Sequence, residues 1–443
     1  MNPYIQYMYS YPHKTAYRAL EGVMLGAYTS CLGGGGNSLY LHIPFCQTKC
    51  GYCNLFSVAG QGEDAVEAYL RAVERQSGQY REVLEPAQVS FSQVVIGGGT
   101  PLYLSKRQMS RMFDGFHKYF RLEGAGKTDL VIETAPNQTT GEKVRILKQA
   151  GATRVSMGIQ SFSDRELAVL GRKHDGRRAA QALSLLMSAD FRCVNVDLIY
   201  GIPGQTVESL LASVKQAVSF QPDEIFLYPL YGKHGVRMER QGVVMDGALA
   251  FTLYQAAAEV LREAGFRQDS MRRFVRGRDT RNWSECGFGN SLALGCGGRS
   301  YLGNLHFCSP YAITSRDCLA ELSSYEQTTD YTEITHGFLL SEEEMRRRYV
   351  IRHLLIRPGL CLEAYKERFG SRATEDFPLL LQWKDRGFAE VQGAFFTLTQ
   401  TGLDLSDYLG PQLISPQVGR AMREWEACHG QTHDFIQGQP EKL

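Results

Sequence analysis

Short β-branched and aromatic-rich runs alternate with helix-length segments along the first half of this 443-residue chain. Strands that alternate with helices favour a parallel sheet or barrel. Two of the intervening segments, 63–84 and 164–189, have helical apolar spacing, and Gly171 and Gly176 are candidate breaks in the second. The pattern predicts an α/β fold, a partial, TIM-like (β/α)6 barrel. Its six strands are expected at 39–45, 94–99, 130–135, 154–160, 194–201 and 224–230.

The predicted strands end in residues that could carry chemistry. In barrels of this kind the reactive groups lie at the carboxyl ends of the strands. These ends hold Cys46, Gly97, Gly99, Thr100, Glu133, Gln160, Asp197 and the segment 228–231. We expect the active or binding site of the barrel among them.

The rest of the chain differs in composition from the predicted barrel core, 39–235. Residues 1–38 form a lead-in or lid segment that ends in a glycine-rich joint, and the strand–helix alternation weakens in 236–335, a predicted extension covering the barrel. Residues 336–428 turn mostly helical, with Ser341 as a helix N-cap before an acidic first turn. Within them, 377–409 has the order helix, short hairpin, helix, which is winged-helix-like. The last residues, 429–443, are predicted to be a flexible tail.

Composition excludes several classes of protein. The net charge of +1 gives no support for a nucleic-acid-binding or membrane-surface protein. No apolar run approaches the length of a transmembrane helix, and the first residues lack the features of a signal peptide, so we expect a cytoplasmic location without a membrane partner. The 11 cysteines are odd in number and scattered, which in a cytoplasmic chain indicates thiols or metal ligands rather than disulfides.

Three cysteines follow the first predicted strand at spacings of four and three: Cys46, Cys50 and Cys53. Three thiolates can hold three irons of a [4Fe-4S] cluster and leave the fourth iron open to a substrate or cofactor. A zinc site or three unlinked buried thiols is the alternative. The glycines of "GGGTP" (97–101) would let backbone approach a ligand closely, although a tight strand–helix turn also needs them.

Six motifs occur in the order found in a known family: "YLHIPFCQTKCGYC", "IGGGTPLYL", "VIETAP", "RVSMGIQSF", "LGRKHD" and "VNVDLIYGIPGQT". Together they resemble the oxygen-independent coproporphyrinogen III oxidase-like (HemN/HemW-like) family of radical S-adenosylmethionine (SAM) proteins. The resemblance is strong over 40–235 and looser elsewhere. It implies that Cys46, Cys50 and Cys53 hold the cluster and that SAM chelates the open iron. An electron from the cluster would then cleave SAM to a 5′-deoxyadenosyl radical.

The resemblance also implies which residues contact SAM. Tyr40, Gly98 and Glu133 match positions around the SAM on the cluster, and Tyr52 matches an aromatic position beside the cluster. Positions that bind a second SAM in the oxidase correspond to Gly99, Thr100, Gln160, Arg172, Asp197 and, through its backbone, Tyr231. Helix capping or ordinary ion pairing is the alternative role for Glu133 and Asp197. For Arg172 the alternative is a solvated helix face, and no catalytic residue is assigned.

The sequence departs from the oxidase at two places and resembles it at a third. Leu55 stands where the oxidase has a further cysteine, which argues against simple decarboxylation of coproporphyrinogen. Arg299 stands where an apolar contact to the second SAM is expected. The segment 7–13 resembles the lead-in that closes the oxidase active site, whereas heme-chaperone relatives mostly lack it. This segment could be a lid over a substrate or a strand packed on the barrel.

For two further groups of residues we favour a structural role over a role in binding. Cys286, Cys296, Cys308 and Cys318 are too widely spaced for a compact auxiliary cluster and read as scattered structural thiols. The basic stretches 232–240 and 271–278 could bind propionates or phosphate, but a solvated basic surface is the favoured explanation.

These features favour a radical SAM enzyme, coproporphyrinogen oxidase-like, that acts on a small-molecule substrate such as a tetrapyrrole or a biosynthetic intermediate. A flavodoxin- or ferredoxin-type protein would supply the electron. Leu55 inclines this prediction toward a methyltransferase or alkyl transfer with two SAM molecules. The alternatives are a heme-binding chaperone that keeps the cluster and SAM, a coproporphyrinogen III decarboxylase, and a zinc-binding structural protein.

Overall fold

Six parallel strands form the centre of the protein in the computed structural model, which describes residues 2–123, 127–231, 236–243, 245–277 and 288–429. Each strand pairs with the next one along the chain, so the sheet order follows the sequence order. The predicted (β/α)6 core is thereby confirmed, with strand limits within a few residues of those expected. The strands are β2 (Asn37–Ile43), β5 (Ser90–Gly98), β7 (Asp129–Thr134), β8 (Ala152–Gln160), β9 (Cys193–Tyr200) and β10 (Glu224–Pro229).

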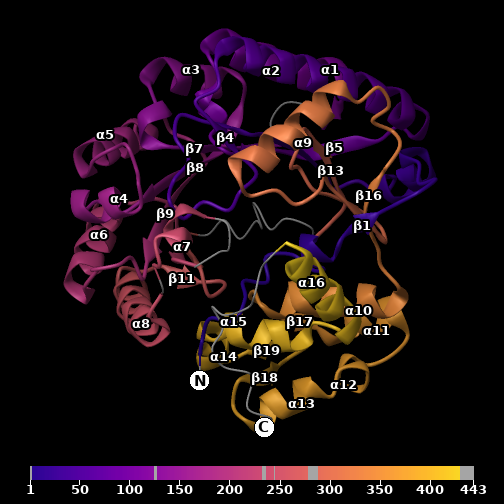
Figure 1. Cartoon of the computed structure of the whole chain (residues 1–443). Coiled ribbons are helices and arrows are strands. Elements are labelled where there is room, and N and C mark those ends of the chain that lie inside the picture. Colours follow the sequence, from indigo (N-terminus) through magenta and orange to yellow (C-terminus); the bar gives the residue numbers. More distant parts are fainter. Residues whose placement is uncertain (1, 124–126, 232–235, 244, 278–287, 430–443) are drawn as a thin grey trace.

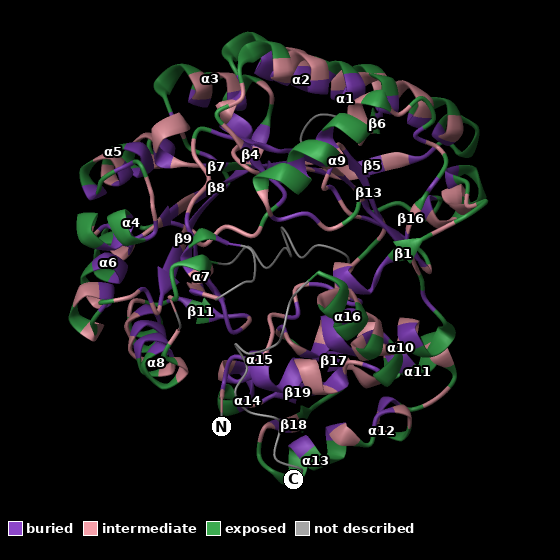
Figure 2. Ribbon diagram, in the orientation of Figure 1, coloured by how far each residue is buried: buried purple, intermediate pink, exposed green. Residues whose placement is uncertain are grey.

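Helices cover the outer side of this curved sheet (Figure 1). They are α1 (Glu63–Leu84), α2 (Lys106–Tyr119), α3 (Gly141–Gln149), α4 (Asp164–Val169), α5 (Gly176–Met187), α6 (Val207–Ser219) and α8 (Gly247–Glu263). The predicted break near Gly171 is confirmed, because that residue has a φ of +72° between α4 and α5. Figure 2 shows the inner strands buried and the outward helix faces exposed, as amphipathic helices on a sheet require.

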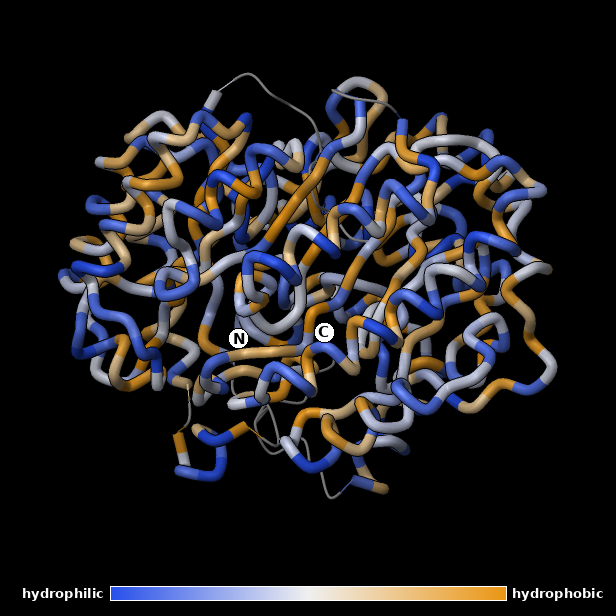
Figure 3. The backbone as a smooth tube through the Cα atoms, turned by 90° about the horizontal axis from the view of Figure 1, so that it is seen from above, coloured by the Kyte–Doolittle hydropathy of each residue, from blue (hydrophilic) through white to orange (hydrophobic). Residues whose placement is uncertain are grey.

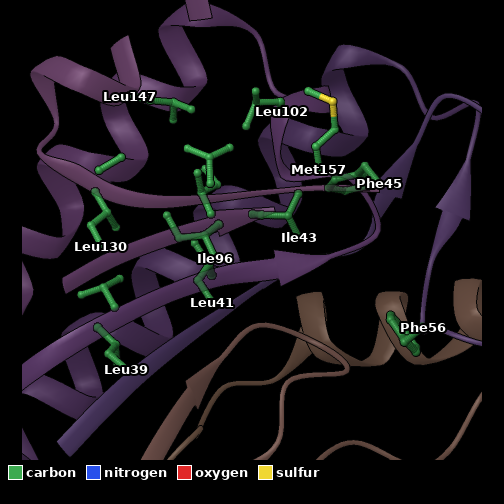
Figure 4. Packing of buried hydrophobic residues seen from close by; sticks show 14 of the residues in the cluster. Leu39, Leu41, Ile43, Phe45, Phe56, Ile96, Leu102, Leu130, Leu147 and Met157 are labelled. Carbon is green, nitrogen blue, oxygen red and sulfur yellow. The ribbon is translucent and has the colours of Figure 1, made fainter. Parts of the chain in front are cut away.

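The barrel core lies between the strands and these helices. Leu39, Leu41 and Ile43 of β2 pack with Ile96 of β5 in one buried cluster (Figure 4). Hydrophobic and hydrophilic segments alternate along the peripheral helices when the molecule is viewed from above (Figure 3). Burial of such side chains supplies the main favourable free energy of the fold. This core holds the strand ends at fixed positions.

The sheet continues beyond the six strands on both sides. At one edge β13 (Ser291–Leu294) runs parallel to β2, and the sheet goes on through β14 (Ser300–Leu302), β15 (Leu305–Phe307), β16 (His336–Leu339) and β1 (Arg18–Ala19). At the other edge lie β12 (Arg273–Val275) and β11 (Arg267–Gln268), and β6 (Arg121–Leu122) pairs with β5. The segment 236–335 therefore extends the barrel sheet and also supplies α7 (Arg237–Arg240) and α9 (Ser315–Gln327).

The C-terminal region has a hydrophobic core of its own around Trp383, Tyr365 and Phe396. The predicted order of helix, hairpin and helix is present, as α13 (Leu379–Asp385), β18 (Ala389–Gln392), β19 (Phe395–Leu398) and α14 (Gln400–Asp404). Ser341 caps α10 as predicted, because its Oγ accepts a hydrogen bond from the Glu344 backbone N–H at 3.3 Å. The remaining elements are α10 (Glu342–Leu354), β17 (Leu360–Cys361), α11 (Leu362–Phe369), α12 (Ala373–Asp376), α15 (Ser406–Leu409) and α16 (Pro416–Cys428). The predicted tail 430–443 lies outside the described residues.

The lead-in joins the C-terminal region to the barrel. Met8 and Tyr11 are buried in the C-terminal core, and the backbone N–H groups of Ile5 and Gln6 each donate to the Asp407 carbonyl at 3.2 Å. Tyr4, by contrast, is buried in the barrel core. Described residues before 18 contain no strand, so the segment 7–13 is an irregular strap, not a strand packed on the barrel.

The sequence favours a solvated basic surface for the stretch 271–278, and this expectation is wrong for two of its residues. Arg272 and Arg273 are only 4% and 2% exposed, and both are in ion pairs, Arg272 with Asp407 and Arg273 with Glu224. Glu224 also accepts from Arg154, 2.7 Å from Nη2. A charge buried inside a protein requires such a partner because it has lost its hydration.

No helix among the described residues is long and apolar enough to span a membrane.

Candidate functional site

The cysteine loop leaves the barrel at the carboxyl end of β2. A short parallel pair, β3 (Phe45–Cys46) and β4 (Val58–Ala59), brackets it, and the Gly60 N–H donates to the Cys46 carbonyl at 3.1 Å. Burial raises the pKa of the Cys46 thiol to about 12, and the neighbouring Cys53 and Cys50 thiols add to the shift. The three sulfurs are therefore close enough to influence one another, and metal binding there would release protons.

The surroundings of the cysteines fit an anionic iron–sulfur cluster. Arg172 directs Nη1 at the Cys50 sulfur at 3.4 Å, while its buried Nε has no hydrogen-bond partner. A thiolate-ligated cluster would satisfy this cation, whereas three neutral thiols would not. The three cysteine sulfurs as donors and the unpaired Nε–H of Arg172 therefore both fit a bound iron–sulfur cluster.

The turn after β5 lies directly against the cysteine segment. Gly98 has a φ of +116°, a conformation that side chains with a Cβ rarely adopt. A Cβ on Gly99 would lie 2.8 Å from the Phe45 carbonyl and 2.9 Å from the Cys46 sulfur. Thr100 follows, with its hydroxyl 3.6 Å from the same sulfur. Glycine is therefore required at 99 by the close approach of two segments of this chain, and the predicted approach of a ligand to these glycines stays a prediction.

Two carboxylates face the interior of the barrel from neighbouring parts of the sheet. The Gly98 backbone N–H donates to Glu133 at 3.2 Å, and Asn195 donates to Asp197 at 2.7 Å. The surrounding protein and, secondarily, Asp197 raise the pKa of Glu133 to about 7, and burial raises the pKa of Asp197 to about 6. Both side chains nevertheless remain accessible to solvent. Such partly desolvated, open carboxylates suit a cationic or hydroxyl-bearing ligand.

Gln160 and Arg172 also lie at the carboxyl ends of the parallel strands, near the two carboxylates. Gln160 ends β8 with a φ of +74°, and its amide lies 2.7 Å from where a Cβ on Gly158 would stand. Arg172 donates to the Gly158 carbonyl, so a solvated helix face does not describe it. Backbone strain of this kind is concentrated at ligand sites.

Tyr52 and Tyr231 line one pocket together with Leu230 and Met238. The Tyr231 hydroxyl donates to Asp407, so its side chain is held by the C-terminal region. The hydroxyl is therefore engaged while the ring lines the pocket, and the expected contact of the Tyr231 backbone with a ligand stays a prediction.

Sequence reasoning missed His42, which positions Tyr40. Burial lowers the pKa of His42 to about 4, so the ring is neutral. Its Nε2 lies 2.9 Å from the Phe56 carbonyl and must carry the proton, which leaves Nδ1 to accept from the Tyr40 hydroxyl at 3.1 Å. The alternation Y-x-H in "YLHI" is too common a strand pattern to have signalled this pair.

The two departures from the oxidase have different surroundings. Leu55 is 48% exposed. Arg299 donates to the hydroxyls of Tyr9 at 3.1 Å and Tyr301 at 3.3 Å and to Ser10, so it holds the lead-in strap.

Of the scattered cysteines, Cys318 lies beside the cysteine loop, with its sulfur 4.0 Å from the Lys49 ammonium. Cys296, Cys308 and Cys318 are buried free thiols, and Cys286 lies outside the described residues. Among the residues that the structure describes, no group of three His, Cys, Asp or Glu side chains is arranged around a single metal ion.

Known proteins are similar to this chain in sequence and in fold. Residues 40–217 match the model of the radical SAM superfamily. The heme chaperone HemW of Escherichia coli (strain K12) is 30% identical over 59% of this chain and 68% of its own length. An oxygen-independent coproporphyrinogen III oxidase of Bradyrhizobium diazoefficiens is 29% identical over 56% of this chain and 55% of its own. The solved structure of the coproporphyrinogen III oxidase HemN from E. coli, at 22% identity, superposes with a TM-score of 0.79 over 92% of this chain and 97% of that one.

Proposed function

Because the chain belongs to the radical SAM superfamily, in its HemN/HemW-like family, we propose that it binds a [4Fe-4S] cluster and SAM and acts as a heme-binding chaperone. The observation that carries the heme part is the similarity to the heme chaperone HemW at 30% identity, joined to the absence of the oxidase cysteine at Leu55. This reverses the order of the two leading expectations from the sequence, in which the enzyme came first.

The cluster ligands in this proposal are Cys46, Cys50 and Cys53. A bound cluster would supply an electron and an open iron to SAM. Arg172 would balance the charge of the thiolates. The turn at Gly98 and Gly99 has no side chains, so SAM could approach its backbone closely. Tyr40, fixed by His42, and Glu133 would contact the SAM beside the cluster.

If a second SAM binds, Gln160, Asp197, Thr100 and the Tyr231 backbone are the groups that would contact it. Arg299, where an apolar contact is expected, holds the lead-in instead. The methyl-transfer prediction has no support of its own in the chain beyond this set.

Glu133→Gln is expected to weaken SAM binding about tenfold while leaving the cluster intact, since a hydrogen bond to a charged group is lost.

In the unaltered protein, SAM should bind more tightly as the pH rises from 6 to 8. With a pKa of about 7, Glu133 is largely protonated at pH 6 and largely ionised at pH 8, and Asp197, with a pKa of about 6, goes from about half to almost fully ionised over the same range. Calorimetry on the reconstituted protein at both pH values measures this. Glu142→Gln, on the outer helix α3, is the control, and a pH-independent affinity would refute the role.

Heme titration tests the chaperone proposal. Stoichiometric binding of heme to the reconstituted full chain, followed by Soret absorbance, is the expected result. The absence of stoichiometric binding would refute it.

The second candidate is a radical enzyme on a bound organic substrate, favoured by the lead-in strap, which heme-chaperone relatives mostly lack. Its test is the production of 5′-deoxyadenosine and S-adenosylhomocysteine from SAM under a strong reductant, with and without coproporphyrinogen. 5′-Deoxyadenosine formation that depends on coproporphyrinogen would place this candidate first.

A further inference from the structure

A row of aromatic rings crosses from the barrel to the extension along the lead-in strap. Tyr228, at the end of β10, lies 6.4 Å from Tyr7, and Tyr7 lies 5.4 Å from Tyr9, between ring centroids. Tyr9 then meets His13 at 6.2 Å, and His13 meets Tyr311 at 6.0 Å. All five rings are half-buried, so each keeps part of its surface open. Neighbouring rings along the row are tilted by 47° to 88°, so a flat conjugated ligand would meet some of them face-on and others by their edges.

Two cations lie along this row. The Lys14 ammonium stands 3.9 Å from the centroid of the Tyr311 ring, and the Arg299 guanidinium 5.3 Å from that of Tyr9. Each therefore projects toward an aromatic face, and Arg299 also donates to the Tyr9 hydroxyl. The lead-in supplies Lys14 and the extension supplies Arg299, so the pair exists only when both segments are docked.

Neither cation has a carboxylate partner among the described residues. Three of the most buried arginines do have one: Arg154 and Arg273 pair with Glu224, and Arg272 pairs with Asp407. Burial and the neighbouring Arg299 lower the pKa of Lys14 to about 7, because no acidic side chain beside the ammonium stabilises its charge. An anion bound between Lys14 and Arg299 would stabilise both charges.

The row ends beside the cysteine loop. Asn54, next to Cys53, hydrogen-bonds the Tyr311 hydroxyl. Lys49, inside the loop, donates to the Ile313 carbonyl at 2.6 Å. A ligand on the row would therefore lie next to the proposed cluster and SAM.

We propose that Lys14 and Arg299, with the aromatic row formed by Tyr7, Tyr9, His13 and Tyr311, bind a tetrapyrrole through its carboxylates. The propionate groups pair with the two cations, and the macrocycle packs on the faces of some rings and the edges of others. This inference rests on the proposed heme-binding function and assigns it a place in the fold. Arg favours carboxylates because its planar fork matches their two oxygens, and the bond is charge-assisted.

The test compares heme with heme dimethyl ester, whose carboxylates are blocked, on the reconstituted full chain. Heme is expected to bind the unaltered protein at least about tenfold more tightly than the ester does. Arg299→Leu and, separately, Lys14→Met should each weaken heme binding about tenfold and leave binding of the ester unchanged. The matched control is Arg372→Leu, whose cation is exposed. Iron content and SAM binding of each variant establish that it is folded and that the carboxylate of SAM is not the ligand concerned.

Three results would overturn the inference. If the ester binds as tightly as heme and neither variant changes heme affinity, heme binding stands and only this site is wrong. If the variants lose SAM affinity instead of heme affinity, the cations serve SAM. If heme fails to bind the unaltered protein, the proposed function fails and this inference fails with it.

Discussion

Cys46→Ala is expected to abolish the iron–sulfur cluster, and with it every SAM-dependent property of the protein. Each thiolate holds its own iron, so two remaining cysteines leave two irons without a protein ligand. Cys46 is also the most enclosed of the three, 9% exposed and packed against the turn at Gly99. Iron and sulfide content after anaerobic reconstitution, together with absorbance near 400 nm, measures the loss.

The control for this variant is Cys361→Ala, which removes a half-buried free thiol of the C-terminal region. It should keep full iron and sulfide content. A Cys46→Ala protein that still held a complete cluster, or still produced 5′-deoxyadenosine, would contradict the ligand assignment.

Glu224→Gln is expected to lower the free energy of unfolding by about 3–5 kcal/mol, the usual result of breaking a buried ion pair by removing one partner. Glu224 is 1% exposed and balances two arginines, Arg154 and Arg273, that are equally buried. The variant removes the carboxylate that pairs with Arg154 and leaves Arg273 with Asp269, at 3.4 Å. Urea unfolding followed by circular dichroism gives the difference, and Glu85→Gln, in an exposed pair with Arg81 at 3.8 Å, should change it by less than about 1 kcal/mol.

The same variant predicts a pH dependence. Burial raises the pKa of Glu224, but Arg154 and Arg273 together lower it below its ordinary value of 4.5. A depressed pKa gives stability that is present above 4.5 and is lost as the pH falls through the folded-state value. The difference between unaltered and Glu224→Gln proteins should therefore shrink in acid. A difference that stays constant down to pH 2 would show that Glu224 does not act through its charge.

Local sequence patterns predict the barrel because its strands and helices alternate with their own periodicities. The helix expected at 63–84 is α1 to the residue, since its apolar spacing runs unbroken between Gly62 and Glu85. The hairpin of the C-terminal region was likewise predictable, because its turn at Gly393 separates two β-rich runs.

Pairings between distant segments were not predictable. β13 runs parallel to β2 although some 250 residues separate them, and β1 pairs with β16 over a still longer distance. Both are short, so neither carries a pattern that distinguishes it from a loop. Only the folded chain shows that they extend one sheet.

Charged residues were misjudged for a related reason. The sequence shows that 271–278 is basic, but not that Arg272 meets Asp407, 135 residues away, or that Arg273 meets Glu224. The individual SAM contacts stay a prediction: the fold gathers Glu133, Asp197, Gln160 and Arg172 at one edge of the sheet, which is the arrangement that the motif order implies.

The most direct test of the central claim, that three cysteines hold a cluster with one iron open to SAM, is electron paramagnetic resonance of the reduced, reconstituted protein with and without SAM. About four irons per chain and a reduced-cluster signal that changes when SAM is added are the results we predict. A bound zinc ion in place of iron, or a cluster signal that SAM leaves unaltered, would contradict the claim.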